Sequence, residues 1–257
     1  MTILVLGGTA EARELAGQLH RGGASVVSSL AGRVARPRLP VGRTRVGGFG
    51  GVGGLAAYVR DEHIDAVVDA THPFAHSISA NAVHACAECD VPLLRLARPG
   101  WADEPGASRW QWVNTHAEAA AAAARLGARP LLTVGRQPLD AFGVLAEYDT
   151  VVRVVDAVDD VPRRWTVIRD RGPYTFDAER ALMESHLVDV LVTKDSGGTY
   201  TRPKLDAADA LDIPVVVVRR PVWPEAQAAV GSVADAFVWA SRWITPRPPH
   251  GAHRTEP

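Results

Sequence analysis

Several features of other protein classes are missing from this sequence, and each absence narrows what the chain can be. No apolar run approaches the roughly 20 residues that a membrane-spanning helix needs, so we expect no membrane association. The net charge of -1 argues against nucleic-acid binding but leaves room for a local basic pocket. The opening MTILVLGG enters a strand without a basic leader, so we predict a cytoplasmic protein. Length and composition indicate a globular protein with one large domain or two small ones.

Lysine is almost absent, although basic residues as a whole are not. Only two of the 28 basic residues are lysines, and these two, Lys194 and Lys204, lie ten positions apart. Either the pair arose by chance, or the chain keeps ammonium groups where a ligand needs them.

Short β-branched runs alternate with alanine-rich segments along most of the chain. This alternation is typical of an α/β protein with a parallel sheet and helices on both faces. In the first half it predicts strands over 2–6, 24–30, 42–46, 64–70 and 92–96, and helices over 9–21, 53–61, 75–88 and 116–126.

The second half repeats this plan. The segment 90–101 matches 212–223 in the pattern D-x-P-x-x-x-x-x-R-P-x-W, while 64–69 matches 188–193 and 3–8 matches 131–136. Three matches in the same order predict two Rossmann-like parallel-sheet subdomains, with the active site in the cleft between them. We place the boundary near 127–130. The prediction is an N-terminal subdomain over 1–128, a C-terminal subdomain over 129–244 and a disordered tail over 245–257.

The first strand and helix are joined by Gly7, Gly8 and Thr9. Glycines permit a sharp turn, and the helix N-terminus then offers free N–H groups to a phosphate. The full G-x-G-x-x-G pattern is absent here and occurs only at 48–53, after the third strand, to the side of the usual phosphate position. We therefore predict a phosphate site at the first turn, with an ordinary tight turn as the alternative.

The end of the second strand lacks the acidic residue that NAD-preferring folds carry about 20 positions past the glycines. It has Ser28 and Ser29 instead, with Arg33 just beyond. Hydroxyls and a guanidinium suit a 2′-phosphate, so the sequence favours NADP(H) over NAD(H). A solvated loop arginine is the alternative for Arg33.

The segment VDATHPFAHSISAN places Thr71 and His72 where an apolar strand meets the next helix, and His76 follows one turn later. Zinc needs three or four ligands, often including a carboxylate or thiolate. Cys86 and Cys89 form the sequence's one C-x-x-C, but they lie near the helix's far end, where the dipole disfavours a thiolate. We therefore expect no metal here and interpret the junction as a loop that touches the dinucleotide.

Cations follow the strands of the second half. These are Arg136, Arg171, Lys194, Lys204, Arg219 and Arg220. Several cations converging on one edge imply a polyanionic ligand, more consistent with a polycarboxylate than with nucleic acid. The segment from Tyr200 to Lys204 also spells the Tyr-x-x-x-Lys pair of short-chain dehydrogenases, but Pro203 disfavours the helical face that this pair needs.

Together these motifs resemble the motif set of a known protein family. The set GGTAEA, DATHPFA, VGR, RGPY, TKDSGG and RRP resembles the precorrin-6A reductase family of cobalamin (vitamin B12) biosynthesis, in order, from residue 3 to about 240. DATHPFA with KDSGG is quite specific, whereas GGT alone is weak. The resemblance implies NADPH-dependent reduction of the precorrin-6A macrocycle to precorrin-6B.

The resemblance also implies roles for residues. NADPH would be held by Gly7, Gly8, Thr9, Ser28, Ser29, Arg33, Thr71 and His72. The carboxylates of the tetrapyrrole would be held by Arg136, Arg171, Lys194, Ser196, Gly197, Lys204 and Arg220. The proton donor is open, with His72, Tyr174 and water as candidates. Relatives are also expected to carry Phe where this chain has Tyr174, which weakens an acid role for that phenol.

Three alternatives remain at this stage. The chain could be a non-catalytic NADP-binding redox sensor or scaffold, but that function would leave the basic second half unexplained. It could be the cobalt-precorrin-6A reductase of the anaerobic branch. A sugar-type epimerase or dehydrogenase is disfavoured by Pro203. We expect transient contact with neighbouring pathway enzymes as the protein partnership.

Overall fold

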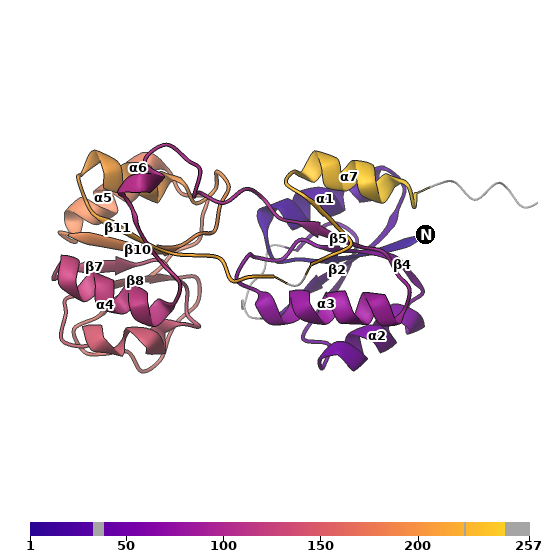
Figure 1. The fold of residues 1–257 in the computed structure, drawn as a ribbon, viewed down its shortest axis with the longest axis horizontal. Helices are drawn as coiled ribbons and strands as arrows, with labels where there is room; N and C mark the ends of the chain where they lie inside the picture. Colours follow the sequence, from indigo (N-terminus) through magenta and orange to yellow (C-terminus); the bar gives the residue numbers. More distant parts are fainter. Residues whose placement is uncertain (33–38, 224, 245–257) are drawn as a thin grey trace, which may run out of the picture. The chain divides into compact units, whose positions relative to one another are not determined.

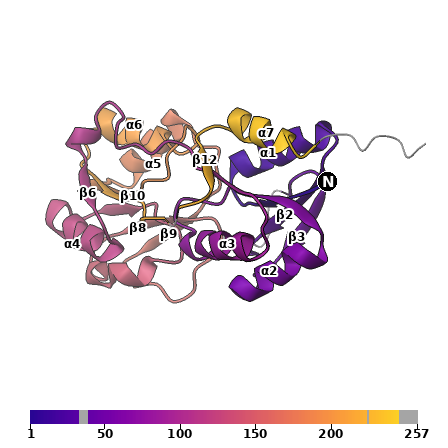
Figure 2. The same cartoon turned by 45° about the vertical axis from the view of Figure 1, so that its right-hand side comes forward.

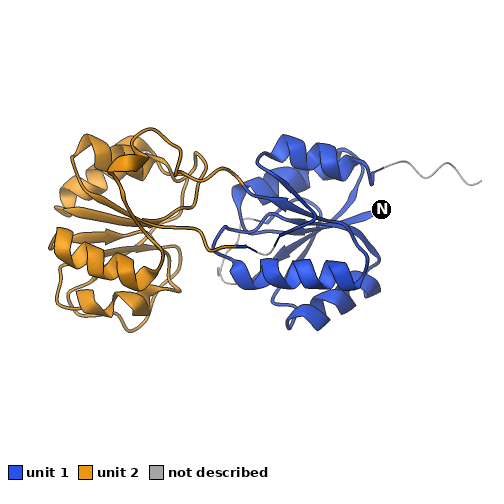
Figure 3. Ribbon diagram, in the orientation of Figure 1, with its two compact units in different colours: residues 1–33, 37–97, 223–257 blue, residues 34–36, 98–222 orange. Residues whose placement is uncertain are grey.

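The computed structural model describes residues 1–32, 39–223 and 225–244. These residues form two compact units (Figure 3). Of the described residues, unit 1 contains 1–32, 39–97, Trp223 and 225–244, whereas unit 2 contains Arg98–Val222. The tail predicted to be disordered, 245–257, lies outside the described residues.

Unit 1 is a six-stranded parallel sheet with two helices on each face (Figure 1). The sheet order is β12-β5-β4-β1-β2-β3. Its strands are β1 (Thr2–Leu6), β2 (Ser25–Leu30), β3 (Arg43–Val46), β4 (Ile64–Asp69), β5 (Leu93–Leu96) and β12 (Ala228–Val230). Its helices are α1 (Ala10–Arg21), α2 (Val52–Asp61), α3 (His76–Glu88) and α7 (Val233–Ser241).

The central strand of unit 1 shows why this sequence forms a buried parallel sheet. In β1, Ile3 and Val5 face the cluster under α1 and α7, while Leu4 and Leu6 face the cluster under α2 and α3. Because both faces are covered, the strand is apolar at every position rather than at alternate ones. The pairing of α7 with α1 is also visible in Figure 2.

Unit 2 repeats the plan with sheet order β6-β11-β10-β7-β8-β9, again parallel throughout. Its strands are β6 (Gln111–Val113), β7 (Pro130–Leu132), β8 (Val151–Val154), β9 (Thr166–Arg169), β10 (Val190–Lys194) and β11 (Val215–Val218). Its helices are α4 (His116–Leu126), α5 (Phe176–Ser185) and α6 (Pro203–Ala210), with the 3-10 segments η1 (Ala107–Arg109) and η2 (Leu139–Leu145). The predicted fold class and repeat are therefore confirmed.

The predicted boundary near residue 128 is not where the structure divides the chain. After β5 the chain leaves unit 1 and supplies β6 and α4 to unit 2, where β6 pairs with β11. After β11 it returns and supplies β12 and α7 to unit 1, where β12 pairs with β5. Each unit thus receives one edge strand and the helix after it from the other half of the sequence. The repeated R-P-x-W segments lie at the two crossings.

Candidate functional site

The turn between β1 and α1 is fixed by Thr9. Its hydroxyl accepts the N–H of Ala12 at 3.0 Å, as a helix N-cap, and donates to the carbonyl of Ala70 at 2.9 Å. One side chain therefore ties the start of α1 to the end of β4. The hydroxyl of Thr9, predicted to bind the cofactor, thus already makes two hydrogen bonds within the protein.

The same turn is open in front of Gly8. Its φ of 116° is a conformation that side-chain-bearing residues rarely adopt, and an added Cβ there would meet no atom within 4 Å. Gly7 lies deeper, with its N–H donating to the carbonyl of Ser29 at 2.9 Å. Open space before a helix N-terminus that carries a positive dipole end is the geometry of a phosphate site.

The two serines at the end of β2 face opposite sides of the sheet. Ser29 accepts a hydrogen bond from the Nη1 of Arg45 at 2.8 Å. Ser28 is buried, and its hydroxyl has no hydrogen-bond partner among the described residues. Arg33, the third member of the predicted 2′-phosphate site, lies outside the described residues.

Arg45 was missed by the sequence analysis, although it lies at the end of β3, beside Ser29. Its guanidinium donates to the carbonyls of Gly47 and Gly48 at 3.0 and 2.9 Å and stacks on the ring of Phe49 at 3.7 Å. Among the described residues, every oxygen bound to Arg45 belongs to a neutral group, so its positive charge has no paired carboxylate. The signal available in the sequence was an arginine one residue before the end of the strand, which a glycine-rich turn follows.

The end of β4 carries a buried ion pair. Asp69 binds the Nη1 of Arg95 at 2.8 Å, and the Arg95 guanidinium stacks over the ring of Trp223 at 3.5 Å. Burial lowers the pKa of Arg95, and the attraction of Asp69 opposes that shift. Thr71 donates its hydroxyl to the same carboxylate at 2.7 Å. The hydroxyl of Thr71 therefore supports the strand end rather than pointing freely at a ligand.

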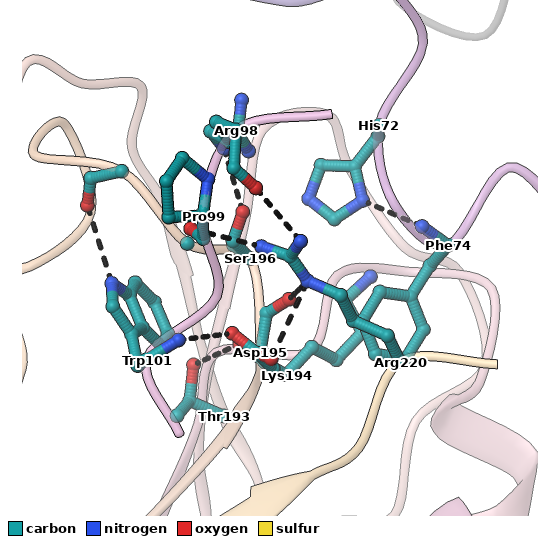
Figure 4. Close-up of polar contacts among 12 residues, drawn as sticks. His72, Phe74, Arg98, Pro99, Trp101, Thr193, Lys194, Asp195, Ser196 and Arg220 are labelled. Atoms are coloured by element: carbon teal, nitrogen blue, oxygen red, sulfur yellow. Dashed lines mark hydrogen bonds and ion pairs between the residues drawn. The ribbon is translucent and has the colours of Figure 1, made fainter. Parts of the chain in front are cut away.

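His72 lies between β4 and α3, as predicted. Its Nδ1 accepts the N–H of Phe74 at 3.2 Å, which places the proton of the neutral ring on Nε2 (Figure 4). His76 stacks against Trp223 with ring centroids 5.8 Å apart, and His84 is exposed on α3. Within the described ranges, no three His, Cys, Asp or Glu side chains are grouped to hold a metal ion.

The nearby cysteines are not set up for thiolate chemistry. Cys86 is buried, and this burial raises the pKa of its thiol to about 12. Cys89 donates its thiol to the carbonyl of Ala56 at 3.5 Å.

In unit 2 the side chain of Lys194 extends from the end of β10 to the turn after β7. Its Nζ lies 3.9 Å from the position that a Cβ on Gly135 would occupy. Burial lowers the pKa of this ammonium group to about 8. Arg136, which follows Gly135, is exposed, and Arg171 is partly exposed beyond β9. Of these three predicted carboxylate ligands, Arg136 and Arg171 are therefore at least partly exposed, whereas Lys194 is largely buried.

Lys204 is placed differently from the prediction. Its side chain is only 3% exposed, and its Nζ donates to the carbonyl of Thr201 at 2.7 Å and lies 5.1 Å from the ring of Trp101. Burial is the main reason that its pKa falls to about 7, with the positive charge of Arg153 adding to the effect. The ammonium group therefore stabilises the loop before α6 rather than reaching the surface.

The KDSGG segment and Arg220 hold the chain crossing at 98–101 (Figure 4). Arg220 donates to the carbonyls of Arg98, Pro99 and Asp195 at 2.8, 3.2 and 3.0 Å. The carboxylate of Asp195 accepts the N–H of Trp101 at 3.0 Å. These hydrogen bonds show a structural task for Arg220, which was predicted as a substrate ligand.

Close backbone approach explains two glycines of this crossing. A Cβ on Gly100 would lie 2.6 Å from a carboxylate oxygen of Asp195. A Cβ on Gly197 would lie 2.2 Å from both the carbonyl oxygen of Pro99 and the guanidinium of Arg220. The adjacent Ser196, also predicted as a ligand, uses its carbonyl to accept the Nε of Arg98 at 2.6 Å.

Tyr174 is engaged within unit 2 as well. Its ring lies under the guanidinium of Arg153 at 4.0 Å, and its hydroxyl donates to the carbonyl of Asp170 at 3.3 Å. Burial raises the pKa of the phenol, which makes it a weaker acid. α6 begins at Pro203, so Tyr200 and Lys204 do not share a helical face, as the sequence predicted.

Comparison with known proteins shows which family the chain belongs to. The family model described as precorrin-6x reductase CbiJ/CobK matches residues 2–241. The chain belongs to this family. The precorrin-6A reductase of Rhodococcus erythropolis is 50% identical over 239 residues, which cover 92% of this chain and 96% of that protein. A solved structure of the precorrin-6A reductase CobK has a TM-score of 0.89 and 37% identity, covering 94% of this chain and 96% of its own.

Membership of the precorrin-6x reductase family makes the chain an oxidoreductase, as the sequence predicted. A cobalt-precorrin-6A reductase from Priestia megaterium is more distant, at 30% identity over 85% of this chain and 90% of that protein. Over the stretches described, the structure has no helix that is both long and apolar enough to cross a membrane.

Proposed function

We propose that this precorrin-6x reductase reduces precorrin-6A to precorrin-6B with NADPH, and that its two units divide the work. The observation that supports this division of roles is a difference between the two units at equivalent positions of the repeat. Unit 1 has an open glycine turn leading into α1, whereas the equivalent turn of unit 2 leads into the 3-10 segment η2. At this turn, unit 1 therefore offers an α-helix N-terminus that suits a dinucleotide phosphate, whereas unit 2 does not.

The residues of unit 1 fit NADPH by the chemistry of their donors. The pyrophosphate suits the space in front of Gly8, where the N–H groups of α1 and its dipole favour negative charge. Arg45, held by neutral oxygens, supplies an uncompensated cation for the 2′-phosphate. Ser29 beside it and Arg33 would complete that site, while the buried hydroxyl of Ser28 remains an unsatisfied donor nearby.

The cations at the strand ends of unit 2 fit the substrate. Precorrin-6A carries acetate and propionate groups, and Arg136, Arg171 and Lys194 would bind them from the strand ends. Arg220, Ser196 and Gly197 would act indirectly, by fixing the crossing segment, and Lys204 would act by fixing the loop before α6.

Bound NADPH supplies the hydride. The contribution of the chain is then orientation, together with fixed positive charge near the reacting ring. His72, at the β4–α3 junction, would contact the cofactor or the substrate from a position fixed by the hydrogen bond between the N–H of Phe74 and its Nδ1.

The closer similarity to precorrin-6A reductases favours the cobalt-free macrocycle as the substrate. The test is an anaerobic assay of NADPH consumption with precorrin-6A and with cobalt-precorrin-6A, each also tried with NADH. We expect turnover with precorrin-6A and NADPH, one cofactor per macrocycle. Preference for the cobalt form would move the protein to the anaerobic branch, and no turnover in any arm would contradict the proposed function.

A further inference from the structure

The loop between β9 and α5 carries Arg171, one of the cations proposed to bind substrate carboxylates. The loop begins against β8, because the N–H of Asp170 donates to the carbonyl of Val154 at 2.9 Å. It ends at α5, where Thr175 caps the helix by accepting the N–H of Ala178 at 3.3 Å. Arg171 lies between these two anchors, so the contacts of its neighbours in the loop help to fix its position.

The ring of Tyr174 contacts the residues on both sides of Arg171. Its hydroxyl donates to the carbonyl of Asp170 at 3.3 Å. On the other side, a Cβ added to Gly172 would lie 3.1 Å from two carbons of the ring, so the ring packs directly against this glycine. A ring that touches the residues before and after Arg171 restricts the backbone from which that arginine extends.

The ring of Tyr174 is held in turn by Arg153 of β8. The Arg153 guanidinium lies 4.0 Å from the centre of the ring and pairs with the carboxylate of Glu179, in the first turn of α5. The two paired side chains are only 4% and 1% exposed. A buried ion pair adds little stability over apolar residues of the same volume, because the cost of desolvation offsets the attraction. This pair does provide a flat cation in one fixed orientation, and such a group stacks well on an aromatic ring.

We propose that Arg153 is a positioning residue, which acts through the ring of Tyr174 to hold Arg171 where a substrate carboxylate binds. The inference rests on the proposed function. Arg153 is too deeply buried to meet the macrocycle itself, so its effect on the substrate passes through the loop. The part of Tyr174 that matters is its ring, whose face meets the guanidinium.

The test compares the Michaelis constants of variants at the three positions. Losing a hydrogen bond to a charged group weakens binding by about 10- to 150-fold, so Arg171→Gln should raise the KM for precorrin-6A by this factor. Tyr174→Leu and Arg153→Lys should raise the same KM up to that limit, because leucine has no ring and lysine has no flat face. The kcat and the affinity for NADPH should stay at wild-type values, as expected when only substrate binding is weakened. Arg180→Gln, an exposed neutralisation on α5, is the matched control and should behave as wild type.

A double variant separates positioning from a merely structural role. If the ring acts through the arginine, Tyr174→Leu should raise the KM no further in a chain that already carries Arg171→Gln. Tyr174→Phe keeps the stacked ring, so its KM should lie much nearer to wild type than that of Tyr174→Leu.

Four results would overturn the proposal. These are an unchanged KM in Arg171→Gln, single effects that multiply in the double variant, a Tyr174→Phe variant as impaired as Tyr174→Leu, and a large fall of kcat in Tyr174→Phe, which would indicate a proton donor instead. Wild-type turnover of precorrin-6A in the same assay keeps each of these results distinct from failure of the proposed function.

Discussion

Replacing Arg45 with alanine tests the cofactor site most directly. The guanidinium has three neutral oxygen partners, so two of its five N–H donors remain for a phosphate. A hydrogen bond to a charged group contributes about 1.5–3 kcal/mol, which corresponds to a loss of about 10- to 150-fold in NADPH affinity. NADH has no 2′-phosphate, so its affinity should change much less. Fluorescence titration of both cofactors against wild type and Arg45→Ala gives the comparison.

The same variant also releases the carbonyls of Gly47 and Gly48, which could loosen the loop. That loosening would weaken both cofactors alike, so only the difference between NADPH and NADH reports the phosphate contact. Arg43→Ala is the matched control, because Arg43 lies two residues earlier on β3 and already pairs with Glu62 at 2.7 Å. An equal loss for NADPH and NADH in Arg45→Ala would refute the assignment of Arg45 to the 2′-phosphate.

Three other expectations are open to test. Thr9→Val should lower the free energy of unfolding by about 2–4 kcal/mol in urea titrations, because it removes an N-cap and leaves the Ala70 carbonyl unpaired, whereas Thr9→Ser should stay near wild type. Lys204 has a folded-state pKa of about 7, below its unfolded value of 10.5, so the free energy of unfolding should rise as the pH rises between these values. Lys204→Met should flatten this rise, and an unchanged slope would exclude Lys204 as its source. Dialysis against a strong chelator should leave turnover intact, and a loss that zinc restores would reveal a metal requirement.

The elements and the fold class were predictable because the local pattern encodes them strongly. Strands such as β1, buried on both faces, appear as continuous apolar runs between turns. The exchange of β6 and β12 between units was not predictable in this way. A local pattern says that a segment is a strand, but it does not say which sheet the strand joins. The matching segments that ended at Trp101 and Trp223 were the available hint, since both lie at the crossings.

The site was less predictable, because a charged residue's place in the sequence does not show whether its donors are already used. Arg220 and Lys204 follow strands and glycines, as a ligand residue would, yet their hydrogen bonds go to backbone carbonyls. Arg45 belongs to no recognisable sequence motif, and only the register of β3 against β2 places it beside Ser29. The glycines gave clearer information about packing. Asp195 approaches Gly100, and Pro99 and Arg220 approach Gly197, so closely that a side chain would not fit at either position.

The two units share one topology, so their differences locate their functions. They diverge at corresponding positions: Ala70 against Lys194, and α1 against η2 after the glycine turn. A helix N-terminus with open space favours a phosphate, whereas an ammonium group such as that of Lys194 beside Gly135 favours a carboxylate. Removing the Lys194 side chain would therefore not turn unit 2 into a second dinucleotide site, because η2 still lacks the aligned N–H groups of an α-helix. Lys194→Ala should bind NADPH with the wild-type stoichiometry of one per chain, and a second bound NADPH would show that the lysine alone separates the two units.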